Sequence, residues 1–178
     1  MVSKTSNAAL NRLTEDEFKS SKKLPIVLVL DNVRSMHNVG AAFRTADAFI
    51  IEAIYLCGIT AKPPHREIEK TAIGATQTVT WKYFDNTLDA LSELKANNYK
   101  IFAVEQTDEK IWLQDVSANA NEKMALVFGH EMNGVDLEVV QAADACIEIP
   151  QWGSKHSLNI SVSVGVVLWE VVKKMQFR

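Results

Sequence analysis

The chain alternates short apolar runs with segments in which apolar residues recur at helical spacing. Runs of β-branched and leucine residues are typical of strands covered on both faces of a sheet. Such runs predict strands at 26–30, 52–57, 79–84, 101–105, 125–128 and 145–149. Apolar residues three or four positions apart predict helices at 39–49, 87–97, 135–142 and 158–175. The alternation predicts an α/β fold, a single domain with a mostly parallel sheet.

The remaining segments complete the predicted organisation. Residues 5–20 carry a few apolar positions among polar ones, which indicates a weak amphipathic helix or arm. The segment 61–74 contains Pro63, Pro64 and Gly74, and it predicts a loop with a short helix. We therefore expect an N-terminal arm at 1–23 and one domain at 24–178.

Composition places the chain among soluble globular proteins. Of its 178 residues, 47% are hydrophobic, which is enough for a real core and excludes disorder for most of the chain. The longest apolar runs, IVLVL and ISVSVGVVLW, are too short or too interrupted to span a bilayer. The first residues are polar and mixed in charge, unlike a secretion signal. We expect a cytoplasmic protein without a membrane partner.

The charge distribution is more informative than the net charge of −3, which argues mildly against a nucleic-acid partner. Residues 83–148 contain 13 acidic and 4 basic side chains, so the rest of the chain is basic. Two groups of basic residues lie outside 83–148. The first is Arg34, Arg44 and Lys155, and the second is Lys62, Arg66, Lys70 and Lys82. A basic face that binds a phosphate backbone and scattered solvated charge are both open interpretations.

Three loops rich in small and polar residues each follow a predicted strand and precede a predicted helix. They lie within 32–49, 126–136 and 149–170. Parallel strands end at one edge of a sheet, so we expect the three loops to form one composite site there. Gly129, Gly134 and Gly153 in these loops would let the backbone approach a ligand closely.

Familiar catalytic signatures are absent. The chain has no GxGxxG, no phosphate-binding GxxxxGK[ST] and no GxSxG elbow. Its histidines, three of them in the loops, lack the spacing of a metal site, so we expect no metal. His156 beside Ser157 suggests a hydrolase, but adjacent residues seldom have nucleophile–base geometry.

Several polar loop residues have both a functional and a structural interpretation. Arg44 is suited to bind phosphate as a bidentate fork, or it is an ordinary surface arginine. Glu131 orients Arg44 or a loop amide, or it is an acid at a helix N-terminus. Ser157 and Asn159 bind a substrate or cap a helix.

Taken together, the loops resemble the three signature motifs of the SpoU, or TrmH-like, branch of the SPOUT RNA methyltransferases. The first motif is matched by Asn38, Gly40 and Arg44, and the second by Gly129, Glu131 and Gly134. The third is matched by Pro150, Gly153, Ser157, Leu158 and Asn159. The segment 67–81 resembles the linking region of this family, and the resemblance covers about 24–174.

The resemblance implies a fold and a cofactor that the spacing alone did not show. The C-terminal segment would form a deep trefoil knot, and the protein would be a homodimer with its active site near the interface. The cofactor would be S-adenosylmethionine. Its implied binding residues are Leu126, Phe128, Gly129, Glu131, Gly134, Ile149, Pro150, Gly153, Ser157 and Leu158.

The implied reaction is methyl transfer to a ribose 2′-hydroxyl of tRNA or rRNA, with a slight preference for tRNA. Arg44 would be the principal catalytic residue, and Asn38, Glu131, Ser157 and Asn159 would position it and the ribose. Arginine stays protonated in water, so we expect Arg44 to hold a phosphate and polarise the hydroxyl rather than act as a base. The alternative function is a catalytically silent RNA-binding or assembly protein on the same fold.

Two departures from the family pattern affect these expectations. The first motif usually has an Asp-Pro pair before its Asn, whereas this chain has Ser35, Met36 and His37. Loss of that proline should loosen the loop but leave the key side chains in place. About 23 residues precede the first predicted strand, so we expect no additional N-terminal domain of the kind found in some relatives, and we expect the core, the dimer and short basic segments to recognise the RNA.

Overall fold

The computed structural model describes residues 2–10 and 12–176; positions 1, 11, 177 and 178, which the predicted arm and domain include, lie outside the described residues. Its strands form one seven-stranded sheet in the order β3-β2-β1-β6-β4-β7-β5, and every pairing is parallel. The strands are β1 (Leu24–Asp31), β2 (Ile51–Cys57), β3 (Thr80–Phe84), β4 (Lys100–Val104), β5 (Ile111–Trp112), β6 (Met124–Phe128) and β7 (Ala145–Glu148). The predicted α/β class and parallel sheet are confirmed.

Most helices lie between strands, with α1 before the first strand and α7 after the last, largely where the pattern predicts them. They are α1 (Glu15–Ser20), α2 (Met36–Ala48), α3 (Arg66–Ala72), α4 (Ala75–Thr78), α5 (Thr87–Ala96), α6 (Leu137–Ala142) and α7 (Ile160–Gln176). Short 3-10 helices occupy Asn7–Leu10 and Leu113–Asp115. The first of these lies within the segment 5–20 that was predicted as a weak helix or arm. The two-residue strand β5 and the 3-10 helix Leu113–Asp115 were not predicted, because elements of two or three residues are too short to show a period.

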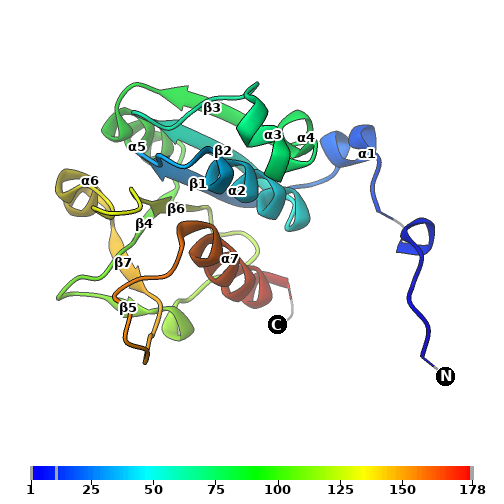
Figure 1. Ribbon diagram of the computed structural model, residues 1–178. Coiled ribbons are helices and arrows are strands. Elements are labelled where there is room, and N and C mark those ends of the chain that lie inside the picture. Colours follow the sequence, from blue (N-terminus) through cyan, green and yellow to red (C-terminus); the bar gives the residue numbers. More distant parts are fainter. Residues whose placement is uncertain (1, 11, 177–178) are drawn as a thin grey trace.

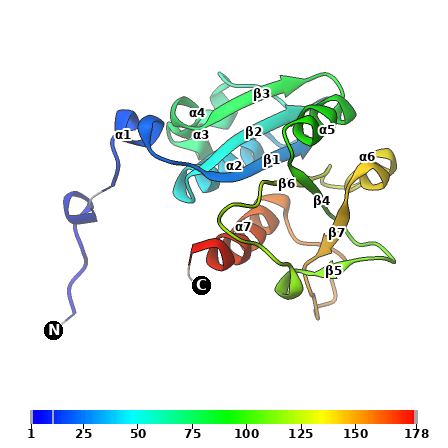
Figure 2. The ribbon, with the colours of Figure 1, turned by 180° about the vertical axis from the view of Figure 1, so that it is seen from behind.

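The sheet is the middle of three layers. In β1, Ile26, Leu28 and Leu30 pack into the core that contains α2 and α7. The alternate residues Val27 and Val29 pack into the opposite core, with α5 and α6. Alternation of side chains along a strand places neighbouring residues on opposite faces. Figure 1 shows α2 and α7 on one side of the sheet, and Figure 2 shows α5 on the other.

The strand order places the candidate site. The chain builds outward from β1 through β2 to β3, and the later strands lie on the other side of β1. In a parallel α/β sheet, ligands bind beyond the carboxyl ends of the strands where the order reverses. Strands β1, β6 and β7 end at this edge and lead into the three polar loops.

Two helices begin two residues later than the pattern predicts, for local reasons. Helix α7 starts at Ile160 instead of 158, because the Asn159 side chain accepts the Ser161 amide at 2.9 Å and caps the helix. Helix α6 starts at Leu137 instead of 135. The Val135 amide donates to the Glu105 carboxylate at 2.8 Å, which holds that residue in the loop.

Helices α2 and α3 touch at Gly40. A Cβ added to Gly40 would lie 2.2 Å from the Ile68 carbonyl oxygen and 2.2 Å from Thr71 Oγ1. Thr71 also donates from Oγ1 to the His37 carbonyl at 2.9 Å, across the same contact. Only glycine allows α3 to pack this closely against the helix that carries the first motif.

We therefore predict that Gly40→Ala destabilises the protein, although alanine favours a helix by about 1 kcal/mol over glycine. The backbone clash with Ile68 should lower the free energy of unfolding by about 1–3 kcal/mol. Urea denaturation checks this. Gly153→Ala is the matched control, because a Cβ there meets no atom within 4 Å. A fully stable Gly40→Ala protein would contradict the close approach of α2 and α3.

Candidate active site

The second and third predicted loops line a cavity of about 490 Å³ at the carboxyl ends of β4, β6 and β7, and the first loop lies beside it. Its volume lies in the range of ordinary small-molecule sites, about 300–1,000 Å³. Phe128, Ile147, Ile149, Leu158 and Ile160 supply apolar side chains to the wall. The second and third loops therefore enclose a pocket with an apolar part and many polar groups at its rim.

Asn38 connects all three loops through its side-chain amide. Its Nδ2 donates to Glu131 Oε1 at 2.9 Å, and its Oδ1 accepts a hydrogen bond from Asn159 Nδ2 at 3.3 Å. Asn38 comes from α2, Glu131 from the loop after β6, and Asn159 from the start of α7. The predicted convergence of Asn38, Glu131 and Asn159 is therefore present in the structure.

The side chain of Glu131 holds the segment before α2 by hydrogen bonds to the backbone of that segment. Its carboxylate accepts the amides of Arg34 at 3.0 Å and Ser35 at 2.9 Å, in addition to the Asn38 side chain. Burial disfavours the charged carboxylate, but these hydrogen bonds outweigh burial and hold the pKa of Glu131 below its usual range. Of the roles considered for Glu131, the structure shows the contact with loop amides and no contact with Arg44.

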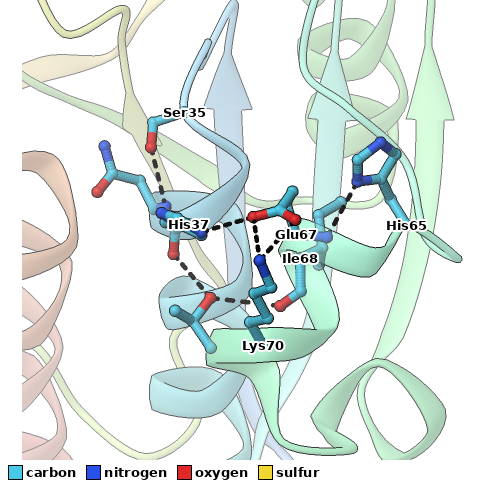
Figure 3. Close-up of polar contacts among 8 residues, drawn as sticks. Ser35, His37, His65, Glu67, Ile68 and Lys70 are labelled. Atoms are coloured by element: carbon cyan, nitrogen blue, oxygen red, sulfur yellow. Dashed lines mark hydrogen bonds and ion pairs between the residues drawn. The ribbon is translucent and has the colours of Figure 1, made fainter.

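The start of α2 has further anchors where the sequence lacks the Asp-Pro pair. Ser35 Oγ accepts the Asn38 amide at 3.3 Å and caps the helix. His37 Nε2 lies 3.1 Å from Glu67 Oε2, and Lys70 Nζ donates to the same carboxylate at 2.7 Å (Figure 3). The segment that the missing proline was expected to loosen is thus held by Glu131, by its own cap and by α3.

Arg44 lies on the exposed side of α2. It follows His37 by seven residues, close to two helical turns, so the two side chains project from the same side of the helix. Among the described residues, the guanidinium of Arg44 takes part in none of the ion pairs. Its five N–H donors are therefore available to an incoming anion.

The predicted cofactor residues fall into two groups. Phe128, Gly129, Glu131, Gly134, Ile149, Ser157 and Leu158 line the cavity. The other three lie elsewhere: Leu126 is fully buried in the core, Pro150 lines a groove beside α7, and Gly153 is exposed in the loop. Ser157 reaches the cavity wall, and Asn159 rather than Ser157 caps α7.

Sequence reasoning missed the contribution of β4 to the cavity. Val104, Glu105 and Gln106, at the end of that strand, line the wall. Gln106 Nε2 also donates to the His156 carbonyl at 2.7 Å, which ties β4 to the third loop. The available signal was the position of these residues at the end of a parallel strand. It was overlooked because only loops leading into helices were considered.

Residues 2–10 and 12–176 contain no group of three or more His, Cys, Asp or Glu side chains arranged to hold a metal ion. No helix in the same part of the chain is both long and apolar enough to cross a membrane. The expectation of a metal-free site stays a prediction.

The model of the SpoU rRNA methylase family matches residues 25–169. The chain belongs to this family. It is 33% identical over 168 residues to the tRNA (guanosine(18)-2′-O)-methyltransferase of Aquifex aeolicus, covering 94% of this chain and 77% of that one. The predicted family membership is confirmed.

Solved structures of family members have the same fold. The crystal structure of the A. aeolicus TrmH/SpoU tRNA modifying enzyme matches with a TM-score of 0.80 at 29% identity, over 90% of this chain and 80% of that one. An AdoMet-bound rRNA methyltransferase from Sinorhizobium meliloti matches with a TM-score of 0.77 at 26% identity, over 90% and 59% of the two chains. The family uses S-adenosylmethionine (AdoMet), as the motifs predicted.

We predict that Glu131→Gln lowers stability at neutral pH by about 1 kcal/mol, because glutamine offers one acceptor oxygen to three donors. The pKa of Glu131 is lower in the folded state than in the unfolded state. The stabilisation by Glu131 is therefore complete above the pKa of this residue in the unfolded chain, about 4.3. It is lost as the pH falls through the lower pKa of the folded protein. Urea denaturation between pH 7 and pH 3 should show the two proteins converging in acid. Glu138→Gln, an exposed carboxylate on α6, serves as the control. A stability difference that is independent of pH would contradict this role.

Proposed function

We propose that this protein transfers a methyl group from S-adenosylmethionine to a ribose 2′-hydroxyl of tRNA or rRNA. The observation that carries the proposal is the Asn38 bridge to Glu131 and Asn159. It fixes the start of α2 beside the cavity, and α2 carries Arg44 on its exposed side. A pocket for a small molecule and an unpaired arginine on an open surface suit a reaction between a bound cofactor and a large substrate.

The cavity is chemically suited to S-adenosylmethionine. Its apolar side chains, among them Phe128, Ile149 and Leu158, can cover an adenine ring. Gly129 and Gly134 bring backbone groups to the wall without side chains. When bound there, the cofactor supplies an activated methyl group on a positively charged sulfur.

The residues around the pocket account for the remaining requirements of the reaction. Alignment of the ribose oxygen with the methyl group lowers the barrier by removing motional freedom. Arg44 would hold a phosphate of the target nucleotide in its guanidinium fork and polarise the hydroxyl. Asn38, Glu131 and Asn159 act through the position of α2, and Ser157 at the cavity wall would contact the ribose or the cofactor.

An RNA substrate is supported by the relatives and by surface charge. The A. aeolicus relative is named for a tRNA and the S. meliloti neighbour for an rRNA. Lys62, Arg66 and Lys70 are exposed on and before α3, and Lys70 shares the Glu67 carboxylate with His37 of α2. Such residues bind phosphate whatever the RNA sequence is, so these contacts do not distinguish tRNA from rRNA as the substrate. An assay with both classes of RNA makes the distinction.

We predict that Arg44→Ala retains AdoMet binding and reduces the rate of methyl transfer by at least about 100-fold, the usual effect of removing a donor at a reacting centre. The assay measures label transferred from AdoMet to separated tRNA and rRNA pools that lack their own modifications. Arg12→Ala, an exposed arginine in the N-terminal arm, should keep the wild-type kcat.

The same assay tests the alternative function. Cofactor binding without label on either pool would support a silent RNA-binding protein and contradict the proposed reaction. Loss of AdoMet binding in Arg44→Ala would show that Arg44 belongs to the cofactor site instead.

We also propose that the chain is a homodimer with a deep trefoil knot at its C-terminal end. The knot is supported by the likeness to the A. aeolicus structure.

The dimer is supported by exposed apolar side chains on α7: Val162 is 49%, Val166 37% and Trp169 53% exposed. Beside them lies a groove of about 410 Å³ that includes Leu113 and Pro150. An apolar helix face next to such a groove is typical of an interface.

We predict that Trp169→Glu dissociates the dimer, because a buried, unpaired carboxylate opposes association. Sedimentation equilibrium of the wild-type protein should give twice the chain mass, and the variant should give a monomer with unchanged helical circular dichroism. Trp169→Phe, which keeps an aromatic ring, should remain dimeric. A monomeric wild-type protein would exclude the dimer.

A further inference from the structure

The cavity wall carries acidic charge without matching basic charge. Of the described residues, Glu105, Glu131 and Glu148 line it, and no lysine or arginine does. The only other titratable side chains on the wall are those of His130 and His156. In a partly enclosed pocket, charges of this kind act on a ligand more strongly than they would in bulk water.

Two of the three carboxylates already have partners that account for them. Glu148 lies 2.8 Å from Lys110 Nζ, so its charge is balanced by a lysine outside the cavity. Glu131 accepts three hydrogen bonds from the first loop, which fix that loop beside the pocket.

Glu105, like Glu131, has only neutral hydrogen-bond donors as partners, but its donors are two backbone amides and none of them belongs to the first loop. Its Oε1 accepts the Gln106 amide at 2.8 Å, and its Oε2 accepts the Val135 amide at 2.8 Å. It takes part in none of the ion pairs between described residues. The amides fix the carboxylate at the end of β4 but leave its negative charge without a cation.

The second loop is shaped around this carboxylate. Gly134 has a positive φ of 70°, and a Cβ added there would lie 2.0 Å from Glu105 Oε2. A residue larger than glycine would displace Glu105 from its two amides. The positive φ favours glycine at this position of the second motif, and the two amides place the carboxylate beside it.

We propose that Glu105 discriminates the methyl donor from the demethylated product by charge. This inference rests on the proposed function, in which the cavity binds S-adenosylmethionine. The donor carries a sulfonium cation in addition to its amino acid group. When the methyl group bonds to the ribose oxygen, the S–CH3 electron pair stays on sulfur and the hydroxyl proton leaves. The product, S-adenosylhomocysteine, is then a neutral thioether.

A fixed carboxylate in the cavity wall stabilises the cationic donor and gives the neutral product no equivalent interaction. Glu105 thereby favours exchange of spent cofactor for fresh donor after each methyl transfer. The apolar wall and the backbone groups bind the parts that the two molecules share, so they cannot make this distinction.

The test compares the affinities of three cofactors for purified wild-type and variant proteins by isothermal titration calorimetry. The cofactors are S-adenosylmethionine, S-adenosylhomocysteine and sinefungin, in which a charged amine replaces the methylated sulfur. Glu105→Gln should lower the affinities for S-adenosylmethionine and sinefungin about five- to tenfold more than the affinity for S-adenosylhomocysteine. A factor of this size is expected for one charge in a partly solvated pocket. Glu105→Asp should keep the wild-type ratio of affinities.

The comparison separates electrostatics from damage to the loop. A structural disturbance in Glu105→Gln would lower the affinities for all three cofactors alike. An equal loss of affinity for the three would therefore overturn the proposal. Unchanged affinities for all three would overturn it as well. Glu109→Gln, an exposed carboxylate outside the cavity wall, changes the net charge equally and should leave the ratio unaltered. If the wild-type protein bound none of the three cofactors, the proposed function itself would fail.

Discussion

The Glu131 carboxylate is the constraint on which the arrangement of the site depends. It accepts two backbone amides from the segment before α2 and the side-chain amide of Asn38. Without it, the amides of Arg34 and Ser35 would lose their partner, and the side chain of Asn38 would keep only its hydrogen bond with Asn159. One carboxylate therefore couples the first loop to the second, and Asn38 extends the coupling to the third. The position of Arg44 follows, because α2 is a rigid helix whose first turn is fixed by these bonds.

Glycines make this geometry possible by allowing backbones to touch. A Cβ on Gly40 would collide with α3, and one on Gly129 would lie 2.1 Å from the Gly134 carbonyl carbon. The first contact sets the distance between α2 and α3, and the second folds the loop after β6 back on itself. His130 and Gly134 exchange backbone hydrogen bonds within that loop, at 2.9 and 2.8 Å. The motif glycines thus have packing roles that are separate from contact with a ligand, although Gly129 and Gly134 also line the cavity.

The fold and most of the site could be predicted because each depends on a local pattern. Apolar runs marked the strands, and polar loops after them marked the edge where Asn38, Glu131 and Asn159 meet. Contacts between distant residues left no such pattern. Nothing near Glu105 in the sequence indicates that it accepts the Val135 amide, thirty residues away. Leu126 was expected near the cofactor because it lies in the strand that leads to the second motif. Its side chain instead points into the core, as the alternation along β6 requires.

The two halves of the reaction are served by opposite charges that the fold keeps apart. Among the described residues, the cavity wall has carboxylates and neither lysine nor arginine, whereas the exposed faces of α2 and α3 present Arg44 and Arg66, together with Lys70, which is paired with Glu67. A cationic cofactor and a polyanionic RNA are thereby attracted to different surfaces, and each surface disfavours the other ligand. Asn38 is neutral and lies between them, with one hydrogen bond toward each of the two cavity loops. A charged residue at position 38 would attract one of the two ligands and repel the other. A neutral amide connects the two surfaces without this effect.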